Sequence, residues 1–394
     1  MKVFLQSIVA QLLLNPYIFV RGYQAIPAKR SWRIPYILFF ILELLLFFTG
    51  YFFHDELADE VFIPIMYICN TWYVASLYIT FSLLCLEVIR LSLRLWKRLP
   101  SWFVENKDKI KLGLFFLIPL AVGLLLVEGY QRVAYPVVRH VHITIPKETP
   151  GRDSLRVVMM SDLHIGEIIG KKMVQRYVTL SNEQNPDMVV LVGDIMDYES
   201  RFAEQAHIED DLKQLQAALG TYLVYGNHEY RANRHAKYKW LKKTGATLLV
   251  DSVVMPDSTF YLIGRDDYIN KKRKTLRSLV KDIDPAKPSI VLDHQPWAFA
   301  ETAMNKIDLG LHGHTHNGQL WPYPLLMKAV YEKAYGYYRK GNTQYYVSSG
   351  IGIAGLPYRV GTVSELVVLH IRFEKPQQDI PVRADNKAVN PGDW

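Results

Sequence analysis

The sequence predicts a membrane-anchored protein with an N-terminal helical part and a C-terminal α/β domain, and two observations support this fold class. The first 130 of the 394 residues contain apolar runs too long for a soluble core, and the remainder alternates short β-branched runs with amphipathic segments. Charged residues make up 21% of the chain and aromatic residues 13%, which excludes intrinsic disorder. We therefore expect a transmembrane helical anchor over 1–130, a linker and first strand over 131–150, the α/β domain over 151–375 and a loose tail over 376–394.

Three segments are long and apolar enough to cross a bilayer as helices, which takes roughly 20 apolar residues. They cover 34–53, 61–86 and 112–130. A fourth segment, 3–20, has the length but includes Gln6, Gln11, Asn15 and Pro16, so it either spans the membrane or lies at its interface. The anchor is therefore predicted to have three or four helices.

The loops between these segments predict the orientation of the chain. The first loop contains Arg21, Lys29, Arg30 and Arg33, and the third contains seven Lys and Arg over 90–111, whereas the short second loop is acidic. Because Lys and Arg mark the cytoplasmic side, we expect the α/β domain on the extracytoplasmic side. The sequence thus predicts a multi-pass integral protein, which we assign to the inner (cytoplasmic) membrane of a bacterium.

Charge and isolated polar residues limit the partners of the helices. Residues 1–150 contain 15 Lys and Arg against 10 Asp and Glu, so five of the eight net positive charges lie near the membrane. This distribution predicts a lipid bilayer as partner and no nucleic acid, and it leaves the oligomeric state open. Glu43 lies in mid-segment and is either a functional carboxylate or a hydrogen-bonded structural one. Cys69 and Cys85 share one apolar segment and predict no disulfide framework.

The second part of the chain shows the alternation typical of a layered α/β domain. Buried strands are predicted over 155–160, 187–192, 221–225, 289–292 and 308–311, and helices over 171–183, 202–218, 233–243 and 272–281. Because the carboxyl ends of strands meet at one crevice in such sheets, the residues that follow the strands are the candidates for chemistry.

Each of the five predicted strands is followed by carboxylate, amide or imidazole side chains. Divalent ions bind imidazole nitrogen and carboxylate oxygen together, so these strand ends predict a metal site. Seven or eight ligands exceed the needs of one ion, but suit a pair that clamps the oxygens of an in-line displacement at phosphorus. Such ions lower the pKa of a bound water and so supply hydroxide for hydrolysis. The strand ends read Asp162-Leu163-His164, Gly193-Asp194, Gly226-Asn227-His228-Glu229, Asp293-His294 and His312-Gly313-His314-Thr315-His316.

These blocks resemble, in order, the motifs of the calcineurin-like metallophosphoesterases. The matching blocks are SDLH (161–164), GD (193–194), GNHE (226–229), DH (293–294) and GHTH (313–316), and the resemblance covers about 155–371. The runs NPDMVVLVGDIMD and GHTHNGQ are similar to the membrane-associated YkuE/YaeI-like branch of bacterial phosphohydrolases. The resemblance implies a layered β-sandwich flanked by helices, with a dinuclear metal centre.

The resemblance also implies roles for individual residues. His228 is implied to contact the phosphate without binding metal and to stabilise or protonate the leaving oxygen, and Asp194 is implied to be catalytic as the bridge between the ions. The ions are expected to be Mn²⁺, Fe²⁺ or Zn²⁺. The implied ligands are Asp162, His164 and His316 for one ion, Asn227, His294 and His314 for the other, and Asp194 for both.

Five further residues are expected to support the site or the substrate. Glu229 is expected to orient a neighbouring histidine, Asp293 to hydrogen-bond a ligand, and His312 to support a ligand or pack. Asn317 replaces the first glycine of the usual GHTHGGQ, and either keeps the turn at positive φ or places an amide near the substrate. Arg359 follows a GxGxxG run at 350–355, which we interpret as a glycine loop bordering the cleft, and is expected to contact the substrate.

The sequence therefore predicts a membrane-anchored, dinuclear metal-dependent phosphoesterase. Its expected substrate is a phosphomonoester or phosphodiester of a membrane lipid or of a membrane-proximal molecule, because a tethered site meets headgroups at high effective concentration. Two alternatives stay open. One is a pyrophosphatase acting on a nucleotide-linked lipid, similar to UDP-diacylglucosamine hydrolase, and the other is a non-catalytic membrane sensor or scaffold that binds a phosphorylated ligand.

Overall fold

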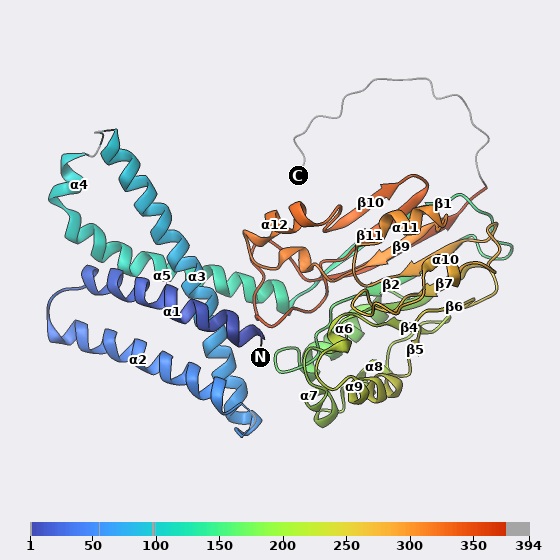
Figure 1. The fold of residues 1–394 in the computed structure, drawn as a ribbon, viewed down its shortest axis with the longest axis horizontal. Helices are drawn as coiled ribbons and strands as arrows, with labels where there is room; N and C mark the ends of the chain where they lie inside the picture. The colour runs from blue at the N-terminus through green and yellow to red at the C-terminus, as the bar shows by residue number, and fades with distance from the viewer. Residues whose placement is uncertain (1, 55, 97, 99, 376–394) are drawn as a thin grey trace.

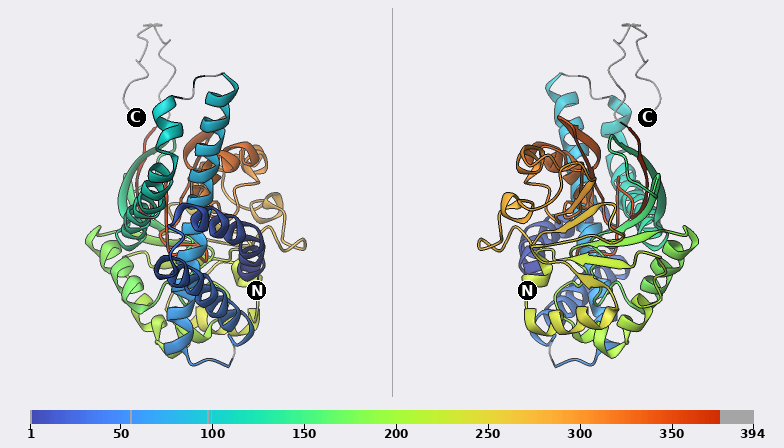
Figure 2. Two further views of the ribbon diagram at one scale, coloured as in Figure 1. Left: turned by 90° about the vertical axis from the view of Figure 1, so that its left-hand side faces the viewer. Right: turned by 90° about the vertical axis from the view of Figure 1, so that its right-hand side faces the viewer.

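The computed structural model describes residues 2–54, 56–96, 98 and 100–375. The predicted loose tail over 376–394 lies outside the described residues. A group of long helices lies at one end of the molecule, and a domain built on two sheets lies at the other (Figures 1 and 2). We refer to residues 2–134 as the helical region and to residues 137–375 as the C-terminal domain.

The helical region confirms the three predicted apolar segments. It forms α1 (Lys2–Ala25), α2 (Arg30–Phe52), α3 (Asp59–Leu95), the short α4 (Ser101–Glu105) and α5 (Lys107–Ala134). Within the described residues, α2, α3 and α5 are long and apolar enough to cross a membrane. Helix α1 packs against all three of them, and its own spanning of the membrane stays a prediction.

The C-terminal domain contains two six-stranded sheets, here called sheets A and B, in its described residues. Sheet A has the order β1-β12-β2-β3-β4-β5, in which β2, β3 and β4 are parallel, and β1 lies parallel to β12. Sheet B has the order β10-β11-β9-β8-β7-β6, in which β7, β8, β9 and β11 are parallel. The strands are β1 (Val137–Ile145), β2 (Ser154–Met160), β3 (Met188–Val192), β4 (Thr221–Val224), β5 (Thr247–Leu248), β6 (Ser252–Val254), β7 (Tyr261–Gly264), β8 (Ser289–Leu292), β9 (Leu309–His312), β10 (Gly336–Lys340), β11 (Thr343–Val347) and β12 (Glu365–Phe373).

The two sheets pack face to face, and helices cover their outer faces. Val157 and Val190 of sheet A share a buried cluster with Ile290 and Leu309 of sheet B. The alternate residues of β2, β3 and β4 instead contact α6 (Lys171–Glu183), α8 (Ile208–Leu212) and α9 (Arg234–Leu241), which lie along one side of the domain in Figure 1. Helices α10 (Leu276–Leu279) and α11 (Phe299–Met304) pack on sheet B. This four-layer arrangement confirms the predicted α/β class.

Most predicted elements agree with the structure, but two helices do not. The helix predicted over 202–218 is split into α7 (Arg201–Gln205) and α8, because His207 between them has a left-handed backbone with φ of +49°. The helix predicted over 272–281 is shortened to α10, whose start is fixed by the Thr275 side chain accepting a hydrogen bond from Ser278 N. Helix α12 (Tyr323–Val330) was not predicted.

The C-terminal domain is fixed to the helical region by the loop that follows His316 and by the loop between β11 and β12. Leu320, Tyr358 and Val360 share a buried cluster with side chains of α1, α3 and α5. Tyr78 of α3 donates a hydrogen bond to the carbonyl of Trp321 (2.8 Å), and Asn70 donates to that of Gly355 (3.2 Å). The helices therefore contact the same edge of the domain that carries the strand-end residues.

Candidate metal centre

The strand ends of both sheets place their polar side chains together. Strands β2, β3 and β4 of sheet A and β8 and β9 of sheet B have their carboxyl ends at one edge of the sandwich. All seven predicted ligands except His314 are buried, and His314 is half-buried. Three overlapping groups of side chains have ligand atoms within 4.8 Å of one another: Asp162, His164 and His316; His164, Asp194 and His228; and Asp194, His294 and His314.

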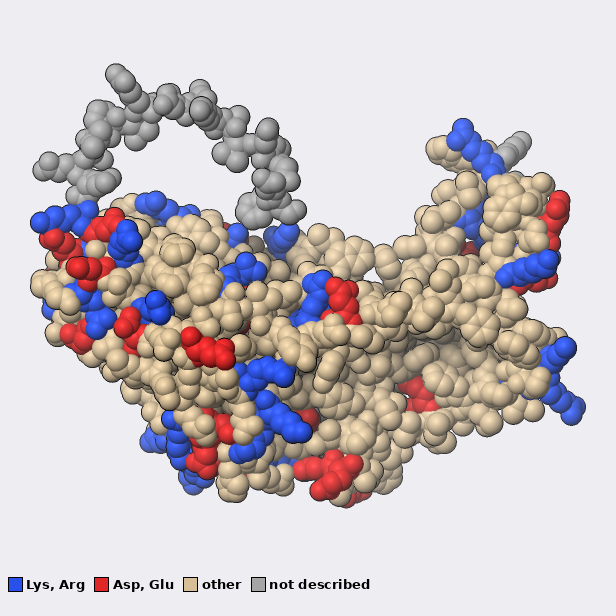
Figure 3. All heavy atoms as spheres, turned by 180° about the vertical axis from the view of Figure 1, so that it is seen from behind, with Lys and Arg blue, Asp and Glu red and all other residues tan. Residues whose placement is uncertain are grey.

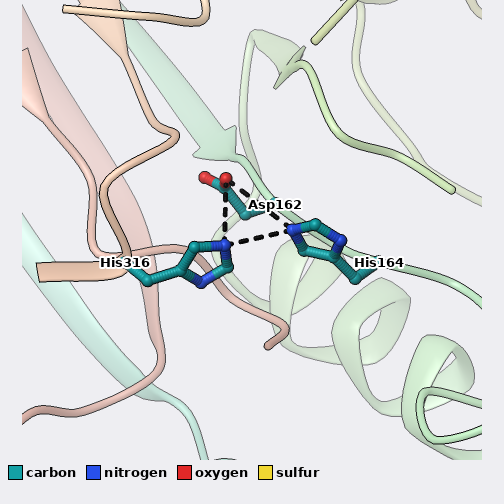
Figure 4. A group of neighbouring side chains, drawn as sticks. All are labelled: Asp162, His164 and His316. Atoms are coloured by element: carbon teal, nitrogen blue, oxygen red, sulfur yellow. Dashed lines mark hydrogen bonds and ion pairs between the residues drawn. The ribbon is translucent and has the colours of Figure 1, made fainter. Parts of the chain in front are cut away.

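The first group consists of Asp162, His164 and His316 (Figure 4). His164 Nε2 lies 3.1 Å from His316 Nε2, and Asp162 Oδ1 lies 3.4 Å from His316 Nε2 and 4.0 Å from His164 Nε2. Two imidazole nitrogens and one carboxylate oxygen thus converge. This is a donor set suited to a borderline divalent ion such as Zn²⁺, Mn²⁺ or Fe²⁺.

Asp194 belongs to both the second and the third group. Asp194 Oδ2 lies 3.2 Å from His294 Nε2 and 3.6 Å from His164 Nε2, so one oxygen faces both groups. Its other oxygen, Oδ1, accepts a hydrogen bond from the backbone of His228 (2.8 Å), which fixes the carboxylate. A carboxylate between two ligand groups occupies the position that a bridging ligand requires.

Two buried polar atoms show that these residues fit divalent ions. His294 Nδ1 lies 2.8 Å from the Val192 carbonyl and donates its proton there, so Nε2 is the nitrogen that faces Asp194 and is the one available to an ion. Among the described residues, neither His294 Nε2 nor Asn227 Oδ1 has a hydrogen-bond partner. Since an unpaired buried polar group costs about 1–3 kcal/mol, a cation at these atoms would remove that cost.

The backbone at the site is unusual and explains the short motifs. Five predicted ligands, Asp162, His164, Asp194, His314 and His316, have left-handed backbones with φ between +49° and +75°. Such conformations are costly outside glycine and gather at functional sites. The glycines beside the ligands leave room for them: a Cβ atom on Gly226 would lie 2.2 Å from Asp194 Oδ1, and one on Gly313 would lie 2.3 Å from Asp162 Oδ2.

His228 lies beside the ligands and is held from both sides. Its Nδ1 lies 2.9 Å from Asp197 Oδ1, and its Nε2 contacts the Arg231 guanidinium. The Lys237 ammonium donates to the carbonyl of His228 (2.7 Å). An arginine side chain only donates hydrogen bonds, so Nε2 accepts from Arg231 and Nδ1 carries the proton. Ring orientation and tautomer are thus both determined.

Asp197 is a residue that the motif analysis did not single out. Its Oδ1 lies between His228 Nδ1 and His164 Nδ1, at 2.9 Å and 3.5 Å. The carboxylate therefore orients a predicted ligand and the predicted phosphate contact together. The sequence feature that could have indicated this residue is its position in GDIMD, three residues after Asp194, where the chain leaves the end of β3.

Glu229 has a different role from the one expected. Its carboxylate accepts hydrogen bonds from the backbone N–H groups of Asp194, Ile195, Met196 and Gly226, at 2.7–3.1 Å. No histidine contacts this carboxylate in the described part of the chain. Glu229 thus fixes the left-handed turn that carries Asp194.

Arg359 is fully buried behind the metal groups. Its guanidinium donates to the carbonyls of His316 (3.0 Å), Ser349 (2.5 Å) and Gly352 (2.9 Å). The 350–355 run is a loop between β11 and β12, as expected, and Gly352 N donates to the Asp162 carbonyl (3.0 Å). Arg359 therefore joins this loop to the turn of His316. The guanidinium is fully buried, and its expected contact with the substrate stays a prediction.

Of the remaining three candidates, Asp293 and His312 lie beside His294 of the third group, and Asn317 follows His316 of the first. Asp293 pairs with Arg273 (3.0 Å) and Arg265 (3.5 Å), while its carbonyl accepts from His312 Nδ1 (2.6 Å). His312 is buried against Phe299, and burial lowers its pKa to about 4, so the ring is neutral. Asn317 has a φ of +49°, which shows that the turn keeps its positive φ without the usual glycine.

Two carboxylates of the site, Asp194 and Asp197, are held in their ionised forms. Burial acts to raise the pKa of Asp194, but His294 and His228 beside it hold that pKa well below its usual range. Burial likewise acts to raise the pKa of Asp197, and His164 and His228 lower it further than burial raises it. Burial lowers the pKa of His228, so its ring is neutral at pH 7. Burial acts to lower the pKa of His294, but Asp194 beside it holds that pKa well above its usual value, and burial raises the pKa of Asp162. Because charged carboxylates and neutral imidazoles are the forms that bind metal, an ion bound at these two residues would displace their protons.

This fold and donor set define a metal-dependent phosphoric ester hydrolase. The profile described as calcineurin-like phosphoesterase matches residues 155–318. The chain is 30% identical over 376 residues to an uncharacterized metallophosphoesterase of Campylobacter jejuni, an alignment that covers 92% of this chain and 96% of that protein. It therefore belongs to the calcineurin-like metallophosphoesterases.

Two further relatives share different parts of the chain. A transmembrane protein with metallophosphoesterase domain from Danio rerio is 31% identical over 370 residues, covering 88% of this chain and 82% of that protein. The uncharacterized metallophosphoesterase YkuE of Bacillus subtilis is 27% identical over 230 residues, covering 56% of this chain and 80% of that protein. The alignments with the Campylobacter jejuni and Danio rerio proteins cover most of this chain and so include apolar helices, which supports a membrane protein.

Proposed function

We propose that this protein is a membrane-anchored phosphoesterase with two divalent ions, acting on a phosphomonoester or phosphodiester of a membrane lipid or membrane-proximal molecule. The observation that carries the proposal is the position of Asp194 Oδ2, which faces His164 on one side and His294 on the other. When bound there, two divalent ions would withdraw charge from phosphoryl oxygens and lower the pKa of a water molecule.

The chain's own residues would orient the substrate. The first ion would be held by Asp162, His164 and His316, and the second by Asn227, His294 and His314. His228 lies beside Asp194 and His164, and Asp197 accepts from its Nδ1, so Nε2 is the nitrogen that would act on the substrate. Once Nε2 takes up a proton and Arg231 turns to the phosphate, it is placed to hydrogen-bond a phosphoryl oxygen or to protonate the leaving oxygen. Arg231, which is half-buried beside His228, adds a cation for the phosphate.

A turnover assay tests this function. The purified full chain with Mn²⁺ is expected to hydrolyse p-nitrophenyl phosphate or its bis-ester, and the rate of Asp194→Ala is expected to fall by about 10³-fold or more, because both ions lose a ligand. Asp282→Ala, at an exposed carboxylate, is the matched control and should keep the wild-type rate. Tight binding of phosphate esters by the wild type without turnover would instead favour the sensor.

We also propose that the C-terminal domain is extracytoplasmic. The chain enters this domain at the end of α5, whereas Arg21, Lys29 and Arg33 lie at the opposite end of the helices. Figure 3 shows basic side chains, with some acidic ones, at that far end, and a mostly uncharged surface with one acidic patch between it and the domain. Fusions of alkaline phosphatase and of a fluorescent protein to the C-terminus test the orientation. Active phosphatase is expected, and fluorescence alone would contradict it.

A further inference from the structure

Helix α12 (Tyr323–Val330) has an apolar sequence, YPLLMKAV, but no buried residue. The exposed fractions of Tyr323, Leu325, Leu326 and Val330 are 56%, 60%, 52% and 48%. In a globular domain, the apolar side chains of a short helix are ordinarily covered by other parts of the protein. A contiguous apolar face that is exposed marks a contact with a partner or a membrane. Its one charged residue is Lys328, in the last turn.

The start of α12 is fixed to a candidate membrane-spanning helix. The ring of Trp321, two residues before the helix, makes an edge contact with Phe81 of α3 at 5.3 Å, and Tyr78 donates to the Trp321 carbonyl. Leu320 is buried among Val74, Tyr78 and Ile79 of the same helix. The exposed face of α12 therefore begins beside the apolar surface of α3, of which Phe81 is itself 43% exposed.

The end of α12 reaches the metal centre. Tyr331, the residue after the helix, packs on Trp297 with ring centroids 4.2 Å apart, and its ring lies 6.3 Å from that of His314. The helix also follows the turn that carries His316 by a few residues. In Figure 1, α12 lies at the edge of the C-terminal domain that faces the helices. A continuous apolar and aromatic surface thus connects α3 with a predicted ligand of the second ion.

We propose that α12 lies in the interfacial layer of the bilayer leaflet that faces the C-terminal domain, and that it leads lipid headgroups to the metal centre. The occupant is lipid because the exposed face continues the membrane-facing surface of α3, and because Lys328 adds a positive charge at headgroup level. The second half of the proposal rests on the proposed function, since it makes an amphiphilic phosphate ester the substrate. The first half stands without it.

A depth measurement tests the position of α12 without any assay of activity. A single cysteine is introduced as Leu326→Cys into the full chain carrying Cys85→Ser, labelled with an environment-sensitive fluorophore and placed in vesicles of anionic phospholipid. Cys69 is buried and stays. Quenching by spin-labelled lipid and protection from aqueous iodide are expected. Met304→Cys is the matched control, because Met304 is 75% exposed on α11, and it should show the opposite pattern.

A pair of substrates tests the guiding role. Leu326→Glu is expected to lower turnover of a fluorescent phospholipid in vesicles by about tenfold or more, because a carboxylate opposes insertion into an anionic interface. Turnover of water-soluble bis-p-nitrophenyl phosphate should stay within about twofold, since Leu326 does not touch the metal groups. Met304→Glu should leave both rates unchanged.

The results of these two experiments test separately the position of α12 in the bilayer and its role in leading lipid headgroups to the metal centre. Quenching of the Leu326→Cys label by iodide contradicts membrane contact, and so does protection from both quenchers, which would indicate cover by protein. If lipid quenches the label but the wild type turns over neither substrate, the proposed function fails while α12 remains a membrane contact. If Leu326→Glu lowers both rates equally, the guiding role is wrong.

Discussion

Two clusters of buried polar side chains among the described residues, one in the helical region and one at the strand ends, differ in how they are paired. In the helical region, the Glu43 carboxylate accepts hydrogen bonds from the amides of Gln11 and Asn15, and Trp72 Nε1 donates to Asn15 Oδ1 (3.0 Å). At the strand ends, His294 Nε2 and Asn227 Oδ1 have no hydrogen-bond partner in the described part of the chain.

This difference separates a structural cluster from a binding cluster. A polar group in an apolar surrounding is tolerated when its partners are all within the protein, and such a network joins helices. Buried atoms that the protein leaves unpaired, on a strained backbone, are instead available to a ligand. The comparison assigns Glu43 a structural role between α1 and α2 and assigns the chemistry to the strand ends.

Apart from the removal of a predicted metal ligand, the largest effect on turnover is expected from a change at Asp197, which contacts His164 and His228. Asp197→Asn should lower kcat by about 10- to 100-fold with two ions still bound, because His164 and His228 lose the anion that orients them. Removing that anion also lowers the pKa of His228, so the basic limb of the kcat profile, where His228 loses the proton that it donates, should move to lower pH. Unchanged kcat and pH profile would show that Asp197 does not act through His228. Asp282→Asn is the exposed control.

The next effect is expected at Arg359, behind His316. Arg359→Met leaves the carbonyls of His316, Ser349 and Gly352 without their donor. We expect Mn²⁺ affinity at one site to fall by about tenfold, and thermal stability to decrease, because the turn of His316 is no longer fixed. Titration of Mn²⁺ by calorimetry measures the first effect. Equal weakening of both sites would contradict a local role, and Arg339→Met on exposed β10 should change neither.

A smaller, pH-dependent effect is expected from the pair of Glu301 and Arg265, which contacts Asp293 beside the ligand His294. Burial acts to raise the pKa of Glu301, but its hydrogen bond with Arg265 (2.6 Å) lowers that pKa below its usual value. The ionised pair therefore adds stability above the usual pKa of about 4.3, and this stability is lost as pH falls below it. Glu301→Gln should lower stability at pH 7 by about 1 kcal/mol or less, since the carboxylate is partly exposed. The difference from wild type should shrink at pH 3.5, and a constant difference in thermal unfolding would contradict the pairing.

The smallest effect on turnover is expected at the structural cluster. Glu43→Gln keeps an acceptor for Asn15 and the shape of the side chain, so turnover of a soluble ester should stay within about twofold. Glu43→Leu should weaken the packing of α1 on α2 and lower thermal stability without altering the kcat pH profile. A large loss of turnover in Glu43→Gln would show that the helical cluster takes part in function and would contradict its assignment as structural.

The sequence predicted the fold class and family well because its signals are local. Apolar runs define the helices, and short β-branched runs followed by Asp162, Asp194 or His294 define strand ends. Asp197 was missed because its role depends on His164 and His228 meeting in space, which no spacing along the chain shows. The role of Glu229 was misjudged for the same reason, since its partners are backbone amides from another turn. Helix α12 was missed because an eight-residue, mostly apolar run after a turn does not distinguish a helix from a loop.

The most direct test of the central claim is anomalous diffraction from crystals of the full chain grown with Mn²⁺. The account predicts two peaks, one among Asp162, His164 and His316 and one beside Asn227, His294 and His314, with Asp194 contacting both. A single peak under saturating Mn²⁺, or peaks away from Asp194, would contradict a two-ion centre.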